Sequence, residues 1–257
     1  MPDSAFRGEL VAALPALHRY ALLLTGNEHD AGDLVQDTVV RGLQSADSFQ
    51  GRASAAGWLR RIMHNLWVDG HRGRRELPSD QIADLVEAQW RDDRYTVDAA
   101  RVAERAEDRE ELRDGLAHLP VIYRTAVVLH DGEGLTVAQV AEVTGTTVAA
   151  AKQRLRRGRM MLVSALAGAS AVPGPGVPMR CWRARSQVSD YLDGALPPGS
   201  ARALEAHLAG CTTCPPLYSA LVATRDGLAR ALADRDPDSV VPPELVRRIE
   251  AHLAATR

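Results

Sequence analysis

The apolar positions of this chain recur at the spacing of an α-helix over most of its length. Residues three or four positions apart mark one helix face in two early stretches, first Leu10, Leu14 and Leu17 and then Leu34, Val35, Val39 and Leu43. Gly-containing turns such as "TGNEHD" separate the patterned stretches. No segment alternates apolar and polar residues as a half-buried strand does, and we therefore predict an all-α protein.

Breaks in this pattern divide the 257 residues into several domains. The stretch "AGASAVPGPGVPM" cannot continue a helix and is predicted to be a flexible hinge. Residues 76–114 hold thirteen Asp or Glu against six Arg, and charge repulsion is expected to keep this segment extended. Within it, "RVAERAEDREELRDGLAHL" is predicted to begin a charged helix. The predicted parts are helical units at 5–75 and 112–167, an acidic linker at 76–111, a hinge at 168–179, a third helical unit at 180–235 and a tail with one short helix at 236–257.

The composition is that of an ordinary globular protein, with 46% hydrophobic and 25% charged residues. Only 4% of the residues are aromatic, so the cores must consist of Leu, Val and Ala, which favours helices. A net charge of −2 excludes a uniformly basic nucleic-acid binder but allows local basic patches. No apolar run of 18 residues and no signal sequence is present, which predicts a cytoplasmic protein without a membrane segment.

A local basic patch lies in residues 135–162, which have the layout of a helix-turn-helix. Thr136 is expected to cap the first helix, Gly145 to permit the turn, and Thr146 or Thr147 to cap the second helix. The second helix has no acidic residue among five cations suited to phosphate contact, Lys152, Arg154, Arg156, Arg157 and Arg159. Gln153 can address a base edge in the major groove. The alternative is a solvated basic helix with no partner.

Both helical units contain motifs of a known family. "DAGDLVQDTVVRGL", "ADSFQG" and "WLRRIMHNLWVDGHRGRR", at residues 30–75, resemble the promoter −10 domain of sigma-70 family factors, closest to the extracytoplasmic-function (ECF) class. "LAHLPVIYRTAVVLHDGEGLTVAQVAEVTGTTVAAAKQRLRRGRMML" resembles the −35 domain of that class. The resemblance, which covers about residues 5–167, implies a non-enzymatic subunit that binds core RNA polymerase, recognises promoter DNA and melts the −10 element.

The resemblance also assigns residues to each partner. The positions that match the polymerase-binding helix are Asp33, Leu34, Gln36 and Asp37. Those that match −10 recognition are Phe49 and Asn65 for a flipped base and Arg60, Arg61, Arg72, Arg74 and Arg75 for phosphates. Those that match −35 contacts are Lys152, Gln153, Arg156 and Arg157. From the residues alone, the first set is equally compatible with an ordinary amphipathic helix.

Two details of this match stay open. Trp58 and Trp67 can stack on bases, but at helical spacing they are also typical core residues. Ala149, Ala150 and Ala151 replace the Gly-Thr-Val step that the family usually carries before the basic helix. Loss of that Thr hydroxyl predicts a weaker or shifted −35 preference.

The third unit carries the stretch "HLAGCTTC" at residues 207–214. His207 and Cys211 are four positions apart and share a helix face, and Cys214 completes a Cys-x2-Cys pair. Cys181 is the remaining thiol, and the residues between allow a helix and a return turn. These four residues predict a closed Cys3His zinc site with no position for a catalytic water, although three unrelated buried cysteines are the alternative.

This unit resembles the zinc-binding anti-sigma domain. The matching segment "YLDG-L" is present as Tyr191, Leu192, Asp193, Gly194 and Leu196. The resemblance implies a domain that contacts the sigma domains and modulates their activity in cis. A helix at 216–233 is expected either to lie between the sigma domains or to pack its leucines only on the zinc unit. Whether the thiolates sense oxidants or only staple the fold is open.

Two other functional classes compete with this interpretation. A metal- or redox-responsive helix-turn-helix repressor explains the basic helix and the thiols, but it leaves residues 30–75 without a purpose. A zinc hydrolase is disfavoured by four ligands and by the absence of a Glu beside the histidine.

Overall fold

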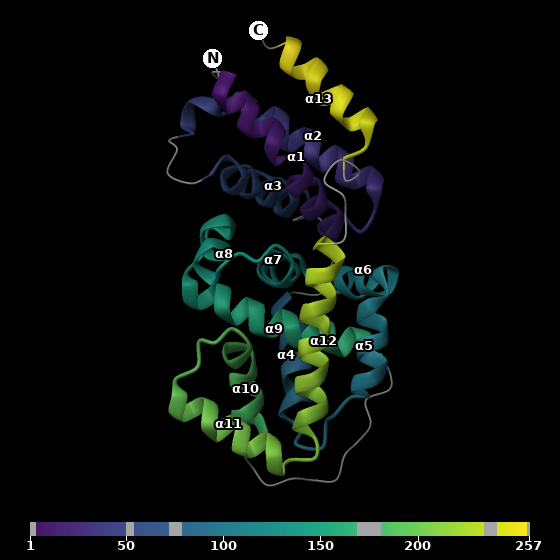
Figure 1. Ribbon diagram of the computed structural model, residues 1–257, viewed down its shortest axis with the longest axis vertical. Coiled ribbons are helices and arrows are strands. Elements are labelled where there is room, and N and C mark those ends of the chain that lie inside the picture. Colours follow the sequence, from purple (N-terminus) through teal and green to yellow (C-terminus); the bar gives the residue numbers. More distant parts are fainter. Residues whose placement is uncertain (1–3, 50–53, 72–78, 169–180, 234–240, 256–257) are drawn as a thin grey trace.

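The computed structural model describes residues 4–49, 54–71, 79–168, 181–233 and 241–255. Every regular element within these ranges is a helix, which confirms the all-α prediction. None of the helices in the described ranges is long and apolar enough to cross a membrane. The helices form an elongated stack in which α1, α2, α3 and α13 lie at one end and α10 and α11 at the other (Figure 1).

The first unit consists of α1 (Ser4–Thr25), α2 (Glu28–Gln44) and α3 (Ala55–His71), which pack on one another. The apolar stripe predicted from the sequence forms its core, with Leu10, Leu17 and Val35 completely buried. The side chain of Asn27 caps α2 by accepting the Asp30 backbone N–H. This capped start fixes the orientation of α2, the helix that carries the predicted polymerase contacts.

The helix-turn-helix consists of α8 (Val137–Thr144) and α9 (Val148–Ala167). Thr136 and Gln139 form a capping box at the start of α8, and Gly145 takes a left-handed conformation with φ 61° in the turn. Thr147, one of the two candidates, caps α9. These local features confirm the predicted motif. Helices α6 (Arg109–Ala117) and α7 (Val121–Val127) and the π-helical turn η2 (Val128–Gly132) complete the second unit.

The prediction of an extended acidic linker is wrong for residues 79–91, which form a helix, whereas the charged helix predicted from residue 101 is present as part of α5 (Ala99–Glu107). The first of these helices, α4 (Ser79–Arg91), packs along α9. Trp90 is completely buried and donates from Nε1 to Ser164 Oγ at 3.1 Å. Packing overcomes the expected repulsion because carboxylates of α4 face arginines of α9 instead of one another.

The third unit consists of α10 (Cys181–Leu192), α11 (Pro198–Gly210) and α12 (Cys214–Ala233). Helix α12 leaves the other two and packs on the linker helix α5 and on α9 and η2 of the second unit (Figure 1). Gly227 makes this possible, since a Cβ there would overlap the backbone oxygen of Ala106 in α5. Helix α12 thus packs beyond the zinc unit, which excludes the alternative that its leucines contact only that unit.

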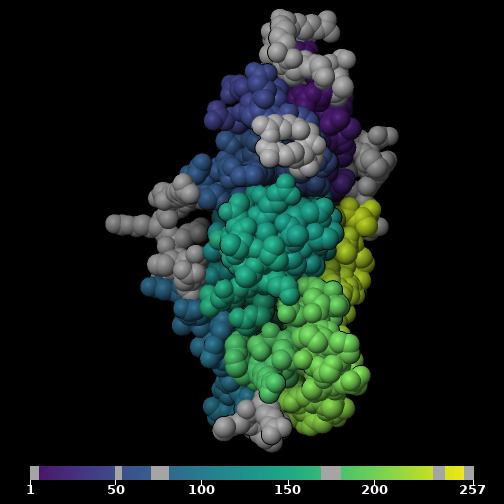
Figure 2. All heavy atoms as spheres, turned by 90° about the vertical axis from the view of Figure 1, so that its left-hand side faces the viewer, coloured from purple at the N-terminus to yellow at the C-terminus, as the bar shows by residue number. Residues whose placement is uncertain are grey.

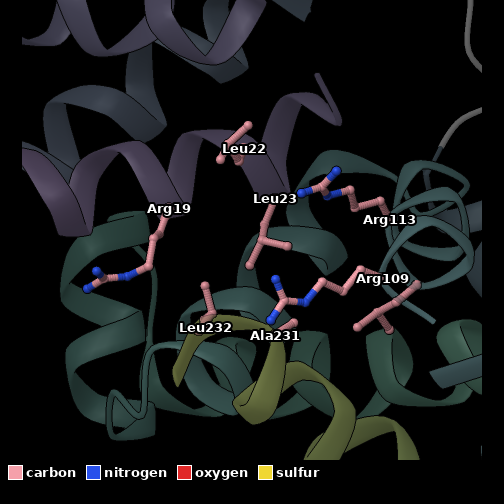
Figure 3. A pocket seen from close by; sticks show the side chains of 8 residues that line it. Arg19, Leu22, Leu23, Arg109, Arg113, Ala231 and Leu232 are labelled. Carbon is pink, nitrogen blue, oxygen red and sulfur yellow. The ribbon is translucent and has the colours of Figure 1, made fainter. Parts of the chain in front are cut away.

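The end of α12 reaches the junction of the first and second units. A small pocket there is walled by Leu22 and Leu23 of α1 and by Leu232 of α12, with Arg109 of α6 beside it (Figure 3). The last helix, α13 (Pro243–Ala255), packs on α2 and buries Leu245 and Ile249. The C-terminal part of the chain therefore touches both sigma-like units.

Candidate metal centre and nucleic-acid interface

The four predicted metal ligands meet at the corner between α10, α11 and α12. Cys181 begins α10, His207 lies in the last turn of α11, Cys211 ends that helix and Cys214 begins α12. The Sγ atoms of Cys181 and Cys211 are 3.8 Å apart, and His207 Nε2 is 3.4 Å from Cys214 Sγ. All four candidate ligand atoms lie within 4.8 Å of one another.

These spacings fit a tetrahedral zinc site. Two sulfur ligands about 2.3 Å from a common centre are about 3.8 Å apart at the tetrahedral angle, and a sulfur and a nitrogen ligand about 3.5 Å apart. The three thiols are buried, and their surroundings within the described chain offer no fifth ligand group in the same cluster. The cluster is therefore placed to bind one metal ion with a closed ligand set.

Burial disfavours the charged form of these thiols in the absence of a cation. It raises the pKa of Cys181 to about 12 and also raises the pKa of Cys214. At Cys211 burial acts in the same direction, but hydrogen bonds from Thr213 and from the Cys214 backbone bring the pKa down to about 7. Burial and the Arg185 charge lower the pKa of His207, which keeps its imidazole neutral, as a metal ligand must be.

The predicted −35 contacts lie together on α9, but most of them are paired with carboxylates of this chain. Gln153 is exposed. The pairs are Lys152 with Asp190 at 3.4 Å, Arg156 with Glu87 at 3.3 Å, Arg157 with Glu87 at 3.1 Å and Arg157 with Asp84 at 3.2 Å. Burial opposes ionisation of Glu87, yet the hydrogen bond from Arg91 and the charges of Arg156 and Arg157 hold its pKa below the usual range.

These carboxylates come from two different parts of the chain. Asp84 and Glu87 belong to α4, whereas Asp190 belongs to α10 of the third unit. Trp182 of α10 adds two cation–π contacts, with Arg91 at 4.5 Å and Arg156 at 5.5 Å from the ring centroid. Figure 2 shows the green surface of the third unit adjoining the teal surface of the helix-turn-helix. The linker helix and the third unit thus neutralise the basic helix together.

The expectation that Arg159 contacts phosphate is wrong. Its side chain is 2% exposed and donates to Asp131 and Asp193, each at 2.6 Å, and to Ser189. Asp131 belongs to η2 of the second unit, just before the helix-turn-helix, whereas Asp193 and Ser189 belong to the third unit. The spacing of cations along α9 could not reveal this, since Arg159 points inward at the seam between two units.

Replacing Arg159 with methionine is expected to lower the free energy of unfolding by about 3–5 kcal/mol at pH 7, because buried Asp131 loses its partner. Burial raises the pKa of Asp131, but the Arg159 hydrogen bond outweighs it and leaves that pKa below normal. The stabilisation is therefore fully present above the pKa of about 4 that Asp131 has in the unfolded chain. It is lost as the pH falls through the lower pKa that Asp131 has in the folded chain. Chemical denaturation of wild type and variant should show their difference narrowing below about pH 4.

The matched control is Arg154→Met, which removes a partly exposed cation of the same helix. It is expected to change the unfolding free energy by about 0.5 kcal/mol or less. Equal stability of the Arg159 variant and the wild type at pH 7 would show that the ion pairs of Arg159 with Asp131 and Asp193 do not stabilise the fold.

The predicted −10 residues are separated by the structure into exposed and packed groups. Arg61 and Asn65 are exposed on α3. Phe49 is half-buried, with its ring centroid 5.3 Å from those of both Phe6 and Trp58. Arg60 is paired with Glu133 of the second unit at 2.6 Å. Three more of the predicted phosphate contacts lie outside the described residues, namely Arg72, Arg74 and Arg75.

The predicted polymerase contacts lie beside the last helix. Asp33 and Asp37 are exposed, Gln36 is half-buried and Leu34 is buried. Arg248 of α13 lies 3.3 Å from Asp33. Sequence reasoning missed α13 as a neighbour of α2. It also missed α4, although Ile82, Val86 and Trp90 repeat at a spacing of four residues and would have predicted that helix.

Three family models match the chain in the order in which its units occur. They are described as "Sigma-70 region 2" over residues 10–76, "Sigma-70, region 4" over 109–162 and "Putative zinc-finger" over 181–214. Two sigma regions, the second built on a helix-turn-helix, define a transcription initiation factor of the sigma-70 class.

Similar proteins narrow the class. The ECF RNA polymerase sigma factor EcfG of Rhodopseudomonas palustris (strain TIE-1) is 31% identical over 162 residues, which cover 63% of this chain and 85% of that protein. The ECF RNA polymerase sigma factor SigM of Mycobacterium tuberculosis (strain ATCC 25618 / H37Rv) is 31% identical over 150 residues, covering 58% of this chain and 71% of that protein. This chain belongs to the ECF sigma factors, as the sequence predicted, and it is not an enzyme.

A solved structure is also similar to this chain. It is the sigma factor RpoE in complex with the anti-sigma factor NepR from Bartonella quintana. The match is 22% identical with a TM-score of 0.47, and it covers 64% of this chain and 98% of that one.

Proposed function

We propose that this sigma factor carries its own inhibitor, and that the C-terminal part of the chain holds the sigma regions in an arrangement that disfavours promoter binding. The observation that supports this most directly is the contact of α10 with the basic helix, where Asp190 pairs with Lys152 and Trp182 lies over Arg156. Carboxylates of α4 pair with Arg156 and Arg157 beside it. Phosphate contact needs these cations free, because DNA binding gains its affinity from replacing counterions with Lys and Arg. Asp84, Glu87 and Asp190 compete with phosphates for them.

The other predicted contacts support the same proposal. Arg60 pairs with Glu133 and joins region 2 to region 4, while α12 packs along the second unit and reaches α1. Helix α13 lies beside Asp33 and covers part of α2, the helix proposed to dock on core polymerase. Opening of the C-terminal part would free Lys152 from Asp190 and remove Trp182 from Arg156. The proposed −10 residues Arg61 and Asn65 are already exposed. We also propose the cytoplasm, where RNA polymerase acts, as its location.

We propose zinc as the ion of the Cys3His cluster. Three thiolates and an imidazole are ligands that zinc prefers, and the spacings match its tetrahedral geometry. The ion would staple α10, α11 and the start of α12 together. Because α12 continues directly from Cys214, the metal corner also anchors the helix that packs on the sigma regions.

Transcription by core polymerase on fragmented genomic DNA tests the proposal, with the 5′ ends of transcripts sequenced. The full chain is compared with a chain truncated after Ala167 and with one truncated after Ala233, which lacks α13. Both truncated chains are expected to initiate at the same sites as the full chain but more often, with the shorter one the more active. Inactivity of all three would contradict the sigma function, whereas equal activity of all three would contradict inhibition in cis.

A further inference from the structure

Arg185 lies in α10, one turn after Cys181, and connects the metal corner to another part of the chain. It is 2% exposed, which is unusual for an arginine unless its N–H groups are satisfied. Its acceptors are Cys214 Sγ at 3.3 Å, Trp90 O at 2.8 Å, Asp92 O at 2.7 Å, Tyr95 O at 2.9 Å, Thr213 Oγ1 at 3.1 Å and Asp93 O at 3.4 Å.

Three of these six acceptors, Asp92 O, Asp93 O and Tyr95 O, belong to the loop between α4 and α5, residues 92–98, which we term the interdomain loop. Two further hydrogen bonds join this loop to the Cys-x2-Cys segment. Thr213 Oγ1 donates to Asp93 O at 3.1 Å, and Thr96 Oγ1 donates to Thr213 O at 3.1 Å. The interdomain loop lies in the segment between the two sigma regions. It is therefore hydrogen-bonded directly to the segment between Cys211 and Cys214, next to the metal cluster.

We infer that Arg185 is a positioning residue that couples occupancy of the metal site to docking of the interdomain loop. One side of its guanidinium faces the ligand Cys214, and the other sides hold loop carbonyls. Hydrogen bonds from groups outside the ligand set orient metal ligands. Here Arg185 orients Cys214, and the position of Cys214 in turn holds Arg185 toward the loop. A bound ion fixes Cys181 and Cys214, and these fix the start of α10 and the plane of the guanidinium. Loss of the ion lets the start of α10 and Cys214 move apart, and the loop carbonyls then lose their hydrogen bonds from Arg185.

The geometry requires arginine at this position. Only a guanidinium presents five N–H donors in one plane, whereas lysine has three donors around a single nitrogen. The loop continues directly from α4, which carries Asp84 and Glu87. If the proposed inhibition holds, release of the loop would therefore also loosen the carboxylates that neutralise α9.

Hydrogen exchange of the full chain, with zinc content measured in parallel, tests the coupling. In the wild type, removal of zinc with a chelator is expected to raise exchange of the loop amides at least about tenfold, since several charge-assisted hydrogen bonds are lost. Arg185→Gln is expected to show that faster exchange while it still binds one zinc ion, with a smaller further rise on chelation. Arg185→Lys, which keeps the charge but loses donors, is expected to be intermediate. The control is Arg183→Gln, an exposed arginine of the same helix, which should behave as the wild type.

Wild-type protection of the loop in zinc-bound Arg185→Gln would overturn the inference. It would also be overturned if zinc removal left loop exchange in the wild type unchanged. Neither readout involves polymerase or DNA, so the coupling can fail while the proposed transcriptional role stands. A wild-type chain without zinc would instead contradict the metal assignment itself.

Discussion

Replacing Gly227 with alanine is expected to increase promoter-directed transcription by the full-length chain about tenfold, because overpacking a tight contact typically costs about 1–3 kcal/mol. Gly227 lies where α12 crosses α5, and an added Cβ would overlap the backbone oxygen of Ala106. A backbone atom cannot rotate away as a side chain can, so α12 must shift from the sigma regions. The change lies thirteen positions or more from the Cys3His cluster and is expected to leave that cluster intact.

The effect has the opposite sign to that of an ordinary helix substitution. Gly→Ala inside a helix normally stabilises it by about 0.5–1 kcal/mol, so weaker docking here can come only from the steric clash. The control is Gly199→Ala in α11, where no atom lies within 4 Å of the added methyl group. Transcription assays should show this control at the wild-type level. Wild-type activity of Gly227→Ala, beside an active chain truncated after Ala167, would show that α12 docking is not the inhibitory contact.

Replacing Cys211 and Cys214 together with serine is expected to abolish zinc binding and to unfold α10 and α11. Metal binding supplies about 10–16 kcal/mol in zinc-finger peptides, and few apolar side chains are available to replace it here. Within the described part of α10 and α11, the buried apolar residues besides Cys181 are Ala184, Val188 and Leu204. Zinc content by atomic absorption should fall from one per chain to none, and hydrogen exchange over 181–210 should lose its protection.

The double variant is also expected to transcribe more strongly, since α12 loses its anchor and Asp190 no longer faces Lys152. Thr212→Ser is the matched control, because Thr212 is exposed in the same short segment between the two cysteines. It should keep one zinc ion and the wild-type activity. If the double variant retained zinc at wild-type affinity, the zinc ligands would lie elsewhere, and the assignment of the ion to the Cys3His cluster would be wrong.

Features that depend on one or two helical turns could be predicted from the sequence. The capping box at Thr136, the left-handed Gly145 and the joining of His207 to Cys211 follow from spacing and from residue chemistry. Cys181 required one further step, since it lies 30 positions from Cys211, but as the remaining thiol it had no competitor. Local geometry limits such sites so strongly that few alternatives exist.

The sequence by itself therefore determined the helical class, the sigma regions and the members of the Cys3His cluster. Only the tertiary structure decided which cations of the basic helix are paired within the chain and what covers α2, the helix proposed to bind polymerase. Arg156 meets Glu87 across 69 positions, and Arg248 meets Asp33 across 215. Arginine has the same charge whether it is buried, paired or exposed, and its partner is set by how whole helices pack. For that reason the spacing of Arg159 resembled a DNA contact, and its burial between two units was seen only in the folded chain.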